Sequence, residues 1–149
     1  MSDLMGIGIR SFILDKESDI NREKSIKIPC IARHFKHELT NNYPDYFYVV
    51  IGICEVKNLN TLNEEEEKNL KRLYWAEDCN NPEAIYSIYE YNGQFYMNSY
   101  FNELPKGSYV IYKSLYNNKT YIQEFNEFMS PVDKEKYPNI KQYWRFELD

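Results

Sequence analysis

The stretch "YFYVVIGICEV" at residues 46–56 decides the fold, because it is almost continuous in β-branched and aromatic side chains. Such a run predicts a strand that is covered on both faces. The whole chain carries 15 Tyr, 8 Phe and 2 Trp among 149 residues, and tyrosine favours pleated, half-buried surfaces. The length suits one domain with a core of its own. We therefore expect a single, mainly β domain over residues 1–149.

A tyrosine-rich hairpin is predicted at residues 84–101. Its turn is Asn92-Gly93, the strongest short hairpin signal, and the flanking residues alternate. A two-stranded hairpin is marginal alone, so one of its faces must pack on the rest of the protein. The two faces carry Tyr86, Ile88 and Glu90, and Ser87, Tyr89 and Tyr91.

Further strands are expected on both sides of these elements. They are rich in β-branched and aromatic residues and are bounded by polar turns. They comprise residues 7–14, residues 108–116 and 119–125 with a turn at Asn117-Asn118, and a closing strand at 141–148.

One helix is predicted, at residues 61–78. Thr61 with Glu64, or Asn63 with Glu66, can form a capping box at its start. The acidic block here favours a solvated helix start, since glutamates lie well near the positive end of the helix dipole. The apolar stripe that must dock on the protein is Leu70, Leu73 and Tyr74.

Charge and cysteine content narrow the class of protein. The formal net charge is −5, which disfavours nonspecific nucleic-acid binding because that binding needs Lys and Arg against phosphates. Three cysteines share no motif spacing, and an odd number without a signal peptide or a transmembrane run is typical of a reducing cytosol. We expect a cytoplasmic protein with free thiols and no membrane contact, in which Cys54 is an inert core thiol.

The segment "CIARHFKHE" at residues 30–38 contains both histidines of the chain, His34 and His37, together with Cys30 and Glu38. These residue types bind zinc, but no second pair completes a four-ligand set nearby. No G-x-S-x-G, H-E-x-x-H or glycine-rich phosphate loop occurs. We expect no catalytic residue, no metal and no cofactor; a small enzyme that depends on His34 is kept as a third hypothesis.

The end of the chain follows the pattern VD-x-x-KYP-x-x-KQ-x-x-RF at residues 132–146. Before it, residues 110–116 have Val, Tyr and Leu-Tyr at matching places, residues 32–36 read "ARHFK", and residues 48–53 form a Val-rich strand. With these motifs, about half of the chain resembles the DUF1653 family of small bacterial and phage proteins.

The resemblance implies a compact β domain likened to an SH3-type barrel, without an established activity. The chain departs from the family at residues 121–124, "YIQE" in place of Trp-Val-Arg-Pro, and at Val56, where the family often has His. Residues 58–106 stand where the family has a short loop. We therefore expect a small SH3-like β-barrel with an inserted α-helix and an extra β-hairpin, and this insertion can carry a new role.

The first functional hypothesis is a non-enzymatic module that binds a small nucleotide-like ligand. Tyr143 or Trp144 with Arg145 can stack on a flat ligand, while Phe146 is expected to face the barrel core. A phage-type protein of this size can sequester a host signalling nucleotide and so act against host defence. The residues expected to bind the ligand are Arg33, His34, Lys36, Tyr112, Gln123, Trp144 and Arg145.

The second hypothesis is a protein–protein inhibitor or adaptor that uses the tyrosine-rich hairpin. Exposed aromatic patches usually mark interfaces, and tyrosine gives contact area at low entropic cost. The same rows of tyrosine predict self-association into a homo-oligomer. The residues expected to contact a partner are Tyr86, Tyr89, Tyr91, Phe95, Tyr96 and Tyr100.

Overall fold

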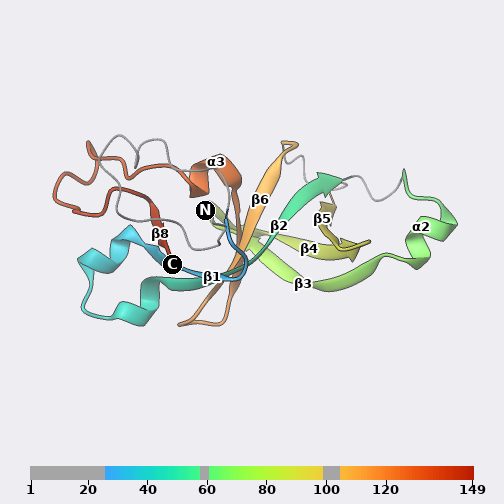
Figure 1. Cartoon of the computed structure of the whole chain (residues 1–149), viewed down its shortest axis with the longest axis horizontal. Coiled ribbons are helices and arrows are strands. Elements are labelled where there is room, and N and C mark those ends of the chain that lie inside the picture. The colour runs from blue at the N-terminus through green and yellow to red at the C-terminus, as the bar shows by residue number, and fades with distance from the viewer. Residues whose placement is uncertain (1–25, 58–60, 99–104) are drawn as a thin grey trace.

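The computed structural model describes residues 26–57, 61–98 and 105–149 of the chain, and strands dominate them (Figure 1). Two short α-helices and two 3-10 helices accompany the strands. The helical elements are η1 (Phe35–Leu39), η2 (Tyr43–Tyr46), α2 (Glu64–Lys68) and α3 (Phe125–Phe128). The strands are β1 (Cys30–His34), β2 (Phe47–Lys57), β3 (Lys71–Asp78), β4 (Asn81–Tyr91), β5 (Gln94–Asn98), β6 (Ser108–Ser114), β7 (Thr120–Glu124) and β8 (Phe146–Leu148).

Six of the strands close into a small barrel. The hydrogen-bonded order runs β5-β4-β3-β7-β6-β2, and a parallel pairing of β5 with β2 closes the ring. Parallel pairs also join β3 to β7, while the other neighbours in the ring are antiparallel. A closed ring leaves its strands without free edges. The expectation of a small β-barrel with a minor helical part is thus confirmed.

Strand β2, predicted from residues 46–56, is present and continues beyond the barrel. Its first half pairs with β1, which in turn pairs with β8, and its second half pairs with β5. Ile51 is an extra residue opposite β6, because Val50 faces Tyr112 and Gly52 faces Ile111. A bulge of this kind shifts the side-chain alternation by one residue. Tyr48 and Val50 before the bulge therefore point to one face of the sheet, whereas Cys54 and Val56 after it, at the same even positions, point to the other.

Two main hydrophobic cores result, beside a smaller cluster of Phe35, Val132 and Ile140. The barrel core fills the ring and includes Cys54, Ile88, Met97, Ile111 and Ile122, each at most 1% exposed. Burial raises the pKa of the Cys54 thiol, as expected for an inert core thiol.

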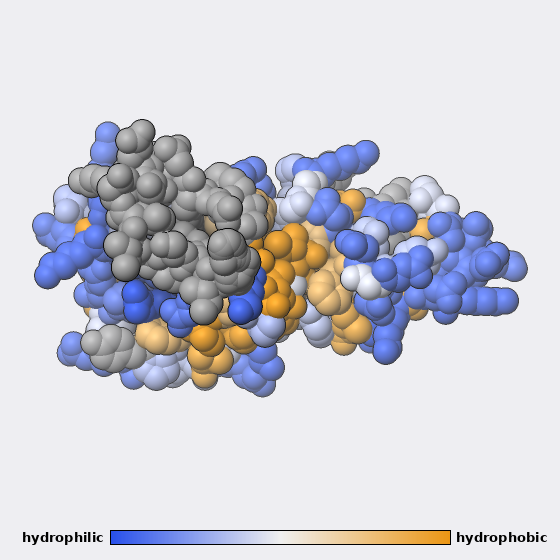
Figure 2. Space-filling view, in the orientation of Figure 1, coloured by the Kyte–Doolittle hydropathy of each residue, from blue (hydrophilic) through white to orange (hydrophobic). Residues whose placement is uncertain are grey.

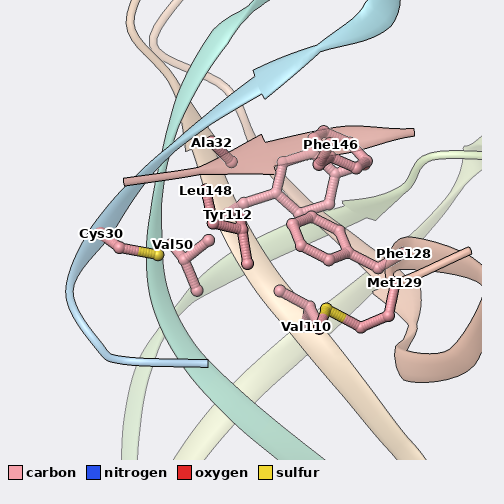
Figure 3. Packing of buried hydrophobic residues seen from close by; sticks show 9 residues of the cluster. All are labelled: Cys30, Ala32, Val50, Val110, Tyr112, Phe128, Met129, Phe146 and Leu148. Atoms are coloured by element: carbon pink, nitrogen blue, oxygen red, sulfur yellow. The ribbon is translucent and has the colours of Figure 1, made fainter. Parts of the chain in front are cut away.

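The outer core lies on the opposite face of β2 and β6 (Figure 3). It is built around Phe128 and Phe146, whose rings stack at a centroid distance of 4.0 Å. Phe146 thus packs in the outer core rather than inside the barrel. The core is Cys30, Ala32, Val50, Val110, Tyr112, Phe128, Met129, Phe146 and Leu148.

Gly52 follows the bulge because β2 and β5 approach closely at this point. A Cβ atom on Gly52 would lie 2.6 Å from Cε2 of Phe95, closer than side chains normally approach. The half-buried Phe95 ring therefore takes the space that a side chain at residue 52 would need.

The helix expected at residues 61–78 is wrong after its first turn. Asn63 and Glu66 form the predicted capping box, with Asn63 Oδ1 accepting from the Glu66 N–H at 2.8 Å. The helix ends at Lys68, and residues 71–78 form strand β3 instead. Aromatic residues such as Tyr74 and Trp75 fit a strand, and pairing with β4 decides between the two structures.

Both expected hairpins are present in the residues that the structure describes. Asn92 and Gly93 have φ of 51° and 81° and join β4 to β5, and Asn118, with φ of 64°, lies in the turn between β6 and β7. The strand expected at residues 7–14 lies outside the described residues. The part expected as an insertion supplies β3, β4 and β5, which are three strands of the closed ring.

The last part of the chain, residues 130–145, is a largely irregular segment that we call the C-terminal arm. Only Phe146–Leu148 of the expected closing strand form a strand, and Pro131 and Trp144 form an isolated bridge. The arm is fixed by Glu38, whose carboxylate oxygens accept the backbone N–H groups of Lys141 and Gln142 at 2.8 Å each. It packs over η1, where Val132 and Ile140 of the arm are buried against Phe35.

Candidate functional site

A cleft of about 480 Å³ opens where the C-terminal arm meets the outer core. Its volume lies within the range of small-molecule binding sites. Five separate parts of the chain contribute: the β1–η1 junction, η2 with the start of β2, the turn between β3 and β4, strands β6 and β7, and the arm with β8. The lining residues are His34, Phe35, Lys36, Tyr46, Tyr48, Cys79, Asn80, Tyr112, Tyr121, Gln123, Asp133, Lys136, Tyr137, Arg145 and Phe146.

One end of the cleft is basic. Lys36 Nζ and Lys136 Nζ lie 6.0 and 5.6 Å from the centre of the same ring, that of Tyr137. Asp133 also lines this end, and its Oδ1 accepts the backbone N–H groups of Glu135 and Lys136 at 3.0 and 3.3 Å. Within residues 26–57, 61–98 and 105–149, neither lysine forms an ion pair with a carboxylate.

Arg145 brings a third cation to the cleft. Its Nε donates to Ser130 Oγ at 3.2 Å, and its backbone N–H donates to the carbonyl of Ser130 at 2.9 Å. These bonds fix the start of the side chain on the arm. No carboxylate of the described residues pairs with its guanidinium, which can therefore pair with an anionic ligand.

His34 lies in the wall between the cations and the aromatic rings. It stacks on Phe35 at a centroid distance of 4.4 Å and meets Phe146 edge-on at 4.9 Å. Burial, and then the positive charges of Lys36, Arg145 and His37, lower its pKa from 6.5 to about 3. Its Nδ1 accepts the Lys36 N–H at 3.1 Å, so the proton of the neutral ring lies on Nε2.

The other end of the cleft is aromatic and uncharged. Tyr112 stacks on Tyr121 at a centroid distance of 5.6 Å, and Tyr48 meets both rings edge-on at 5.2 and 6.2 Å. Burial raises the pKa of Tyr48 to about 12, raises that of Tyr112 well above 10, and raises that of Cys79 to about 12. These groups are therefore neutral near pH 7.

Amide groups at this end are held in fixed orientations. Tyr112 O–H donates to Gln123 Oε1 at 3.2 Å, and Gln123 Nε2 donates to Glu127 Oε1 at 2.8 Å. Asn80 Nδ2 donates to the same Glu127 oxygen at 2.9 Å. Each amide nitrogen has a second N–H, which can recognise the polar edge of a ligand.

The cysteine that lines the cleft is not activated as a nucleophile. A catalytic cysteine needs a lowered pKa and an adjacent base, yet the Cys79 thiol is neutral and His34 resists protonation. In the part of the chain that the structure describes, no group of three or more His, Cys, Asp or Glu is arranged to bind a metal ion.

Five of the seven residues expected to bind a ligand meet at this cleft: His34, Lys36, Tyr112, Gln123 and Arg145. The other two do not line it. Arg33 points away and pairs with Glu147 on β8 at 3.6 Å, and Trp144 is only 6% exposed.

Sequence reasoning missed several lining residues. Asp133, Lys136 and Tyr137 belong to the tail pattern at residues 132–146, which was a signal for them. Tyr46, Tyr48, Cys79, Asn80 and Tyr121 come from three distant segments without a shared motif, and only the fold brings them together.

The residues expected to contact a protein partner differ in burial. Tyr86 is 6% exposed and lies inside the barrel, so it is unavailable to a partner in this fold. Tyr89, Tyr91, Phe95 and Tyr96 are half-buried, and Tyr100 lies outside the described residues. The most exposed apolar side chains of strands β3 and β4 are instead those of Trp75 and Ile85, which are 56% and 53% exposed.

The end of the molecule that carries α2 has a polar surface (Figure 2). Figure 2 shows hydrophilic residues gathered over the end that carries α2, in line with the glutamates of that helix. Among the described residues, no helix is both long enough and apolar enough to cross a membrane.

No family model, curated protein or solved structure matches this chain.

Proposed function

We propose that this chain is a non-enzymatic recognition module that binds a small nucleotide-like molecule in the cleft. The observation that carries the proposal is the meeting of Lys36, Lys136 and Arg145 with a wall of tyrosine rings. Cations without carboxylate partners favour an anionic ligand, and aromatic faces favour a planar one.

The neutral groups of the cleft support binding without turnover. His34, Cys79 and Tyr112 are all held uncharged, so the described residues that line the cleft offer hydrogen bonds rather than an activated nucleophile. A protein of this kind can sequester a host signalling nucleotide, as a phage-type anti-defence protein in the cytoplasm would. Membership of the DUF1653 family belongs to the same proposal, and the small barrel is compatible with it.

Isothermal titration calorimetry with a panel of nucleotides tests the proposal, after native mass spectrometry of the protein as purified. We expect saturable binding of at least one nucleotide, weakened at least tenfold by Arg145→Gln. The matched control is Lys141→Gln, which removes a cation from the same arm but outside the cleft lining. Absence of heat and of thermal shift with every nucleotide would overturn the proposal.

A protein-binding role is the second candidate, and the exposure of Trp75 and Ile85 favours it. Both lie on the outer side of the β3–β4 pair, and Arg72 stacks over Trp75 at 5.1 Å from the ring centre. Aromatic residues with arginine are typical of interface centres. The same surface can join two copies of the chain.

The test of this second candidate is a double substitution, Trp75→Ser with Ile85→Thr, because deleting residues 84–101 would open the barrel ring. We expect it to abolish partner capture from host lysate or self-association in light scattering, with the thermal stability kept. A wild-type protein that is monomeric at high concentration and captures no partner contradicts this candidate.

A further inference from the structure

The ring contacts in the cleft define an order from one end to the other. Tyr137 contacts Phe35, Phe35 contacts His34, and His34 contacts Phe146. Phe146 then contacts Tyr48 and Tyr112. The basic end at Tyr137 and the tyrosine end are thus separated by a row of rings, and a ligand that reaches both must be elongated.

The charges of the cleft are arranged along the same direction. Lys36 and Lys136 lie at the Tyr137 end, and Arg145 is close enough to shift the pKa values of both His34 and Cys79. Against these three cations the lining holds one carboxylate, that of Asp133. The balance is two positive charges, which matches a phosphate monoester at neutral pH.

The opposite end repels an anion. The Glu127 carboxylate lies directly behind the amides of Asn80 and Gln123, to which it is hydrogen-bonded at 2.9 and 2.8 Å. A phosphate placed there would face a negative charge, whereas a neutral planar ring would not. The remaining N–H of each amide and the Asn80 carbonyl match the donors and acceptors on the edge of a nucleobase.

We infer that the ligand of this cleft is a nucleoside monophosphate whose phosphate lies between Lys36 and Lys136 and whose base lies against Tyr48 and Tyr121. This inference rests on the proposed function and adds to it the charge and the direction of the ligand. Stacking of a base on an aromatic side chain typically stabilises a complex by about 1–3 kcal/mol. The lysines at the phosphate end should make the cleft bind a nucleotide more tightly than the matching uncharged nucleoside.

The test compares affinities within one chemical series by calorimetry: AMP, GMP, CMP and UMP, the four matching nucleosides, the four triphosphates, and inorganic phosphate. We expect at least one monophosphate to bind at least tenfold tighter than its nucleoside and no weaker than its triphosphate. The Lys36→Gln, Lys136→Gln double variant should bring the ratio of monophosphate to nucleoside affinity close to one, while Lys141→Gln keeps the wild-type ratio.

The failures of this test are distinguishable. If nucleosides bind as tightly as monophosphates, or triphosphates bind far tighter, the inference is wrong while the binding function stands. If inorganic phosphate binds as tightly as the monophosphates, the base end plays no part and the inference is equally wrong. If none of these compounds binds, the inference is wrong, and the proposed function fails as well when no other nucleotide of the panel binds.

Discussion

The two faces of strand β6 belong to different hydrophobic cores. Tyr109 and Ile111 point into the barrel core, while Val110 and Tyr112 point into the outer core. The barrel core is enclosed by a ring of paired strands, whereas the irregular C-terminal arm buries Val132 and Ile140 against Phe35 in a smaller cluster. Of the two main cores, only the outer one contributes to the cleft. Its contributing residues are Tyr48, Cys79, Tyr112, Tyr121 and Phe146.

The strands thus support the site and supply its tyrosine end, and the irregular arm completes it with Lys136 and Arg145. The barrel strands are joined by continuous backbone pairing, whereas the arm is held by a few backbone bonds and by the side chains of Glu38 and Gln142. Gln142, for example, donates to the carbonyls of Arg33 and Trp144 at 3.0 and 2.9 Å and thereby ties the arm to β1. A site placed on the arm can change while the barrel is kept.

Truncation of one large side chain in each core gives the largest expected effect. Phe128→Ala should lower the free energy of unfolding by about 3–5 kcal/mol and Ile88→Ala by about 2–5 kcal/mol, since both side chains are fully buried. Only Phe128→Ala should disturb the cleft, because Phe128 supports the lining ring of Phe146.

Urea unfolding measures the two losses, and ¹⁵N–¹H spectra of the folded variants show where the structure changes. Because Phe128 lies in the outer core, we expect changes of chemical shift around His34 and Tyr112 in the Phe128 variant only. Equal shifts at these residues in the Ile88 variant would show that the cores are not separate.

Gly52→Ala tests the bulge that switches β2 from one core to the other. The new Cβ would meet the Phe95 ring, and overpacking of this kind costs about 1–3 kcal/mol. The same substitution in a Phe95→Leu background should cost clearly less, and thermal unfolding of the four proteins gives the coupling. Additive effects of the two changes would contradict a direct contact.

The sequence predicted the regular elements better than the irregular ones. The apolar run at residues 46–56 and the turns at Asn92-Gly93 and Asn118 are local signals, and β2 and both hairpins follow from them. Strand β3 was mistaken for helix because Leu70, Leu73 and Tyr74 recur at helical spacing. Pairing with β4, a contact that spacing does not reveal, makes residues 71–78 a strand.

Some residues of the site could be predicted from the sequence, but their arrangement could not. Lys36 and Arg145 stood in basic-aromatic segments that could be noticed in the sequence, whereas Asn80 lies in an ordinary turn. Arg33 was misplaced because strand alternation puts Ala32 in the outer core and Arg33 on the opposite face, beside Glu147. The composition of the site was visible, but its geometry depends on contacts between distant segments.

The pH dependence of the free energy of unfolding should change when His34 in the cleft is replaced, but not when a barrel-core residue is replaced. The folded His34 has a pKa of about 3, so between pH 6.5 and 3 the unfolded chain binds a proton that the native chain does not. This contribution is fully present above pH 6.5 and is lost as the pH falls, by about 1.4 kcal/mol per pH unit. In His34→Gln the fall between pH 6 and 4 should be shallower by about 1 kcal/mol per unit.

Chemical denaturation at a series of pH values provides this slope, and the comparison of slopes separates titration from the packing lost at every pH. Ile88→Ala, which changes the barrel core, is the control and should keep the wild-type slope. A His34→Gln protein with an unchanged slope would mean that His34 is protonated in the native wall.

The smallest expected effect concerns the bond that fixes the arm. Burial alone would raise the pKa of Glu38, but the N–H groups of Lys141 and Gln142, with the charges of His37 and Lys134, lower it below its usual value. The stabilisation is therefore present above the unfolded-state pKa near 4.5 and is lost as the pH falls through the lower native value. Because this carboxylate is largely exposed, Glu38→Gln should cost about 1 kcal/mol or less.

The clearest consequence of Glu38→Gln is local. The side-chain amide has an NH2 group in place of one carboxylate oxygen, so in the same geometry one of the two backbone N–H groups bound at 2.8 Å faces a donor instead of an acceptor. Hydrogen exchange at Lys141 and Gln142 should become faster at pH 7 while exchange in the barrel stays the same. Glu135→Gln, which removes an exposed carboxylate from the same arm, should leave both rates unchanged. Equal acceleration in barrel and arm would mean that the two regions open together, and the division between support and site would not hold.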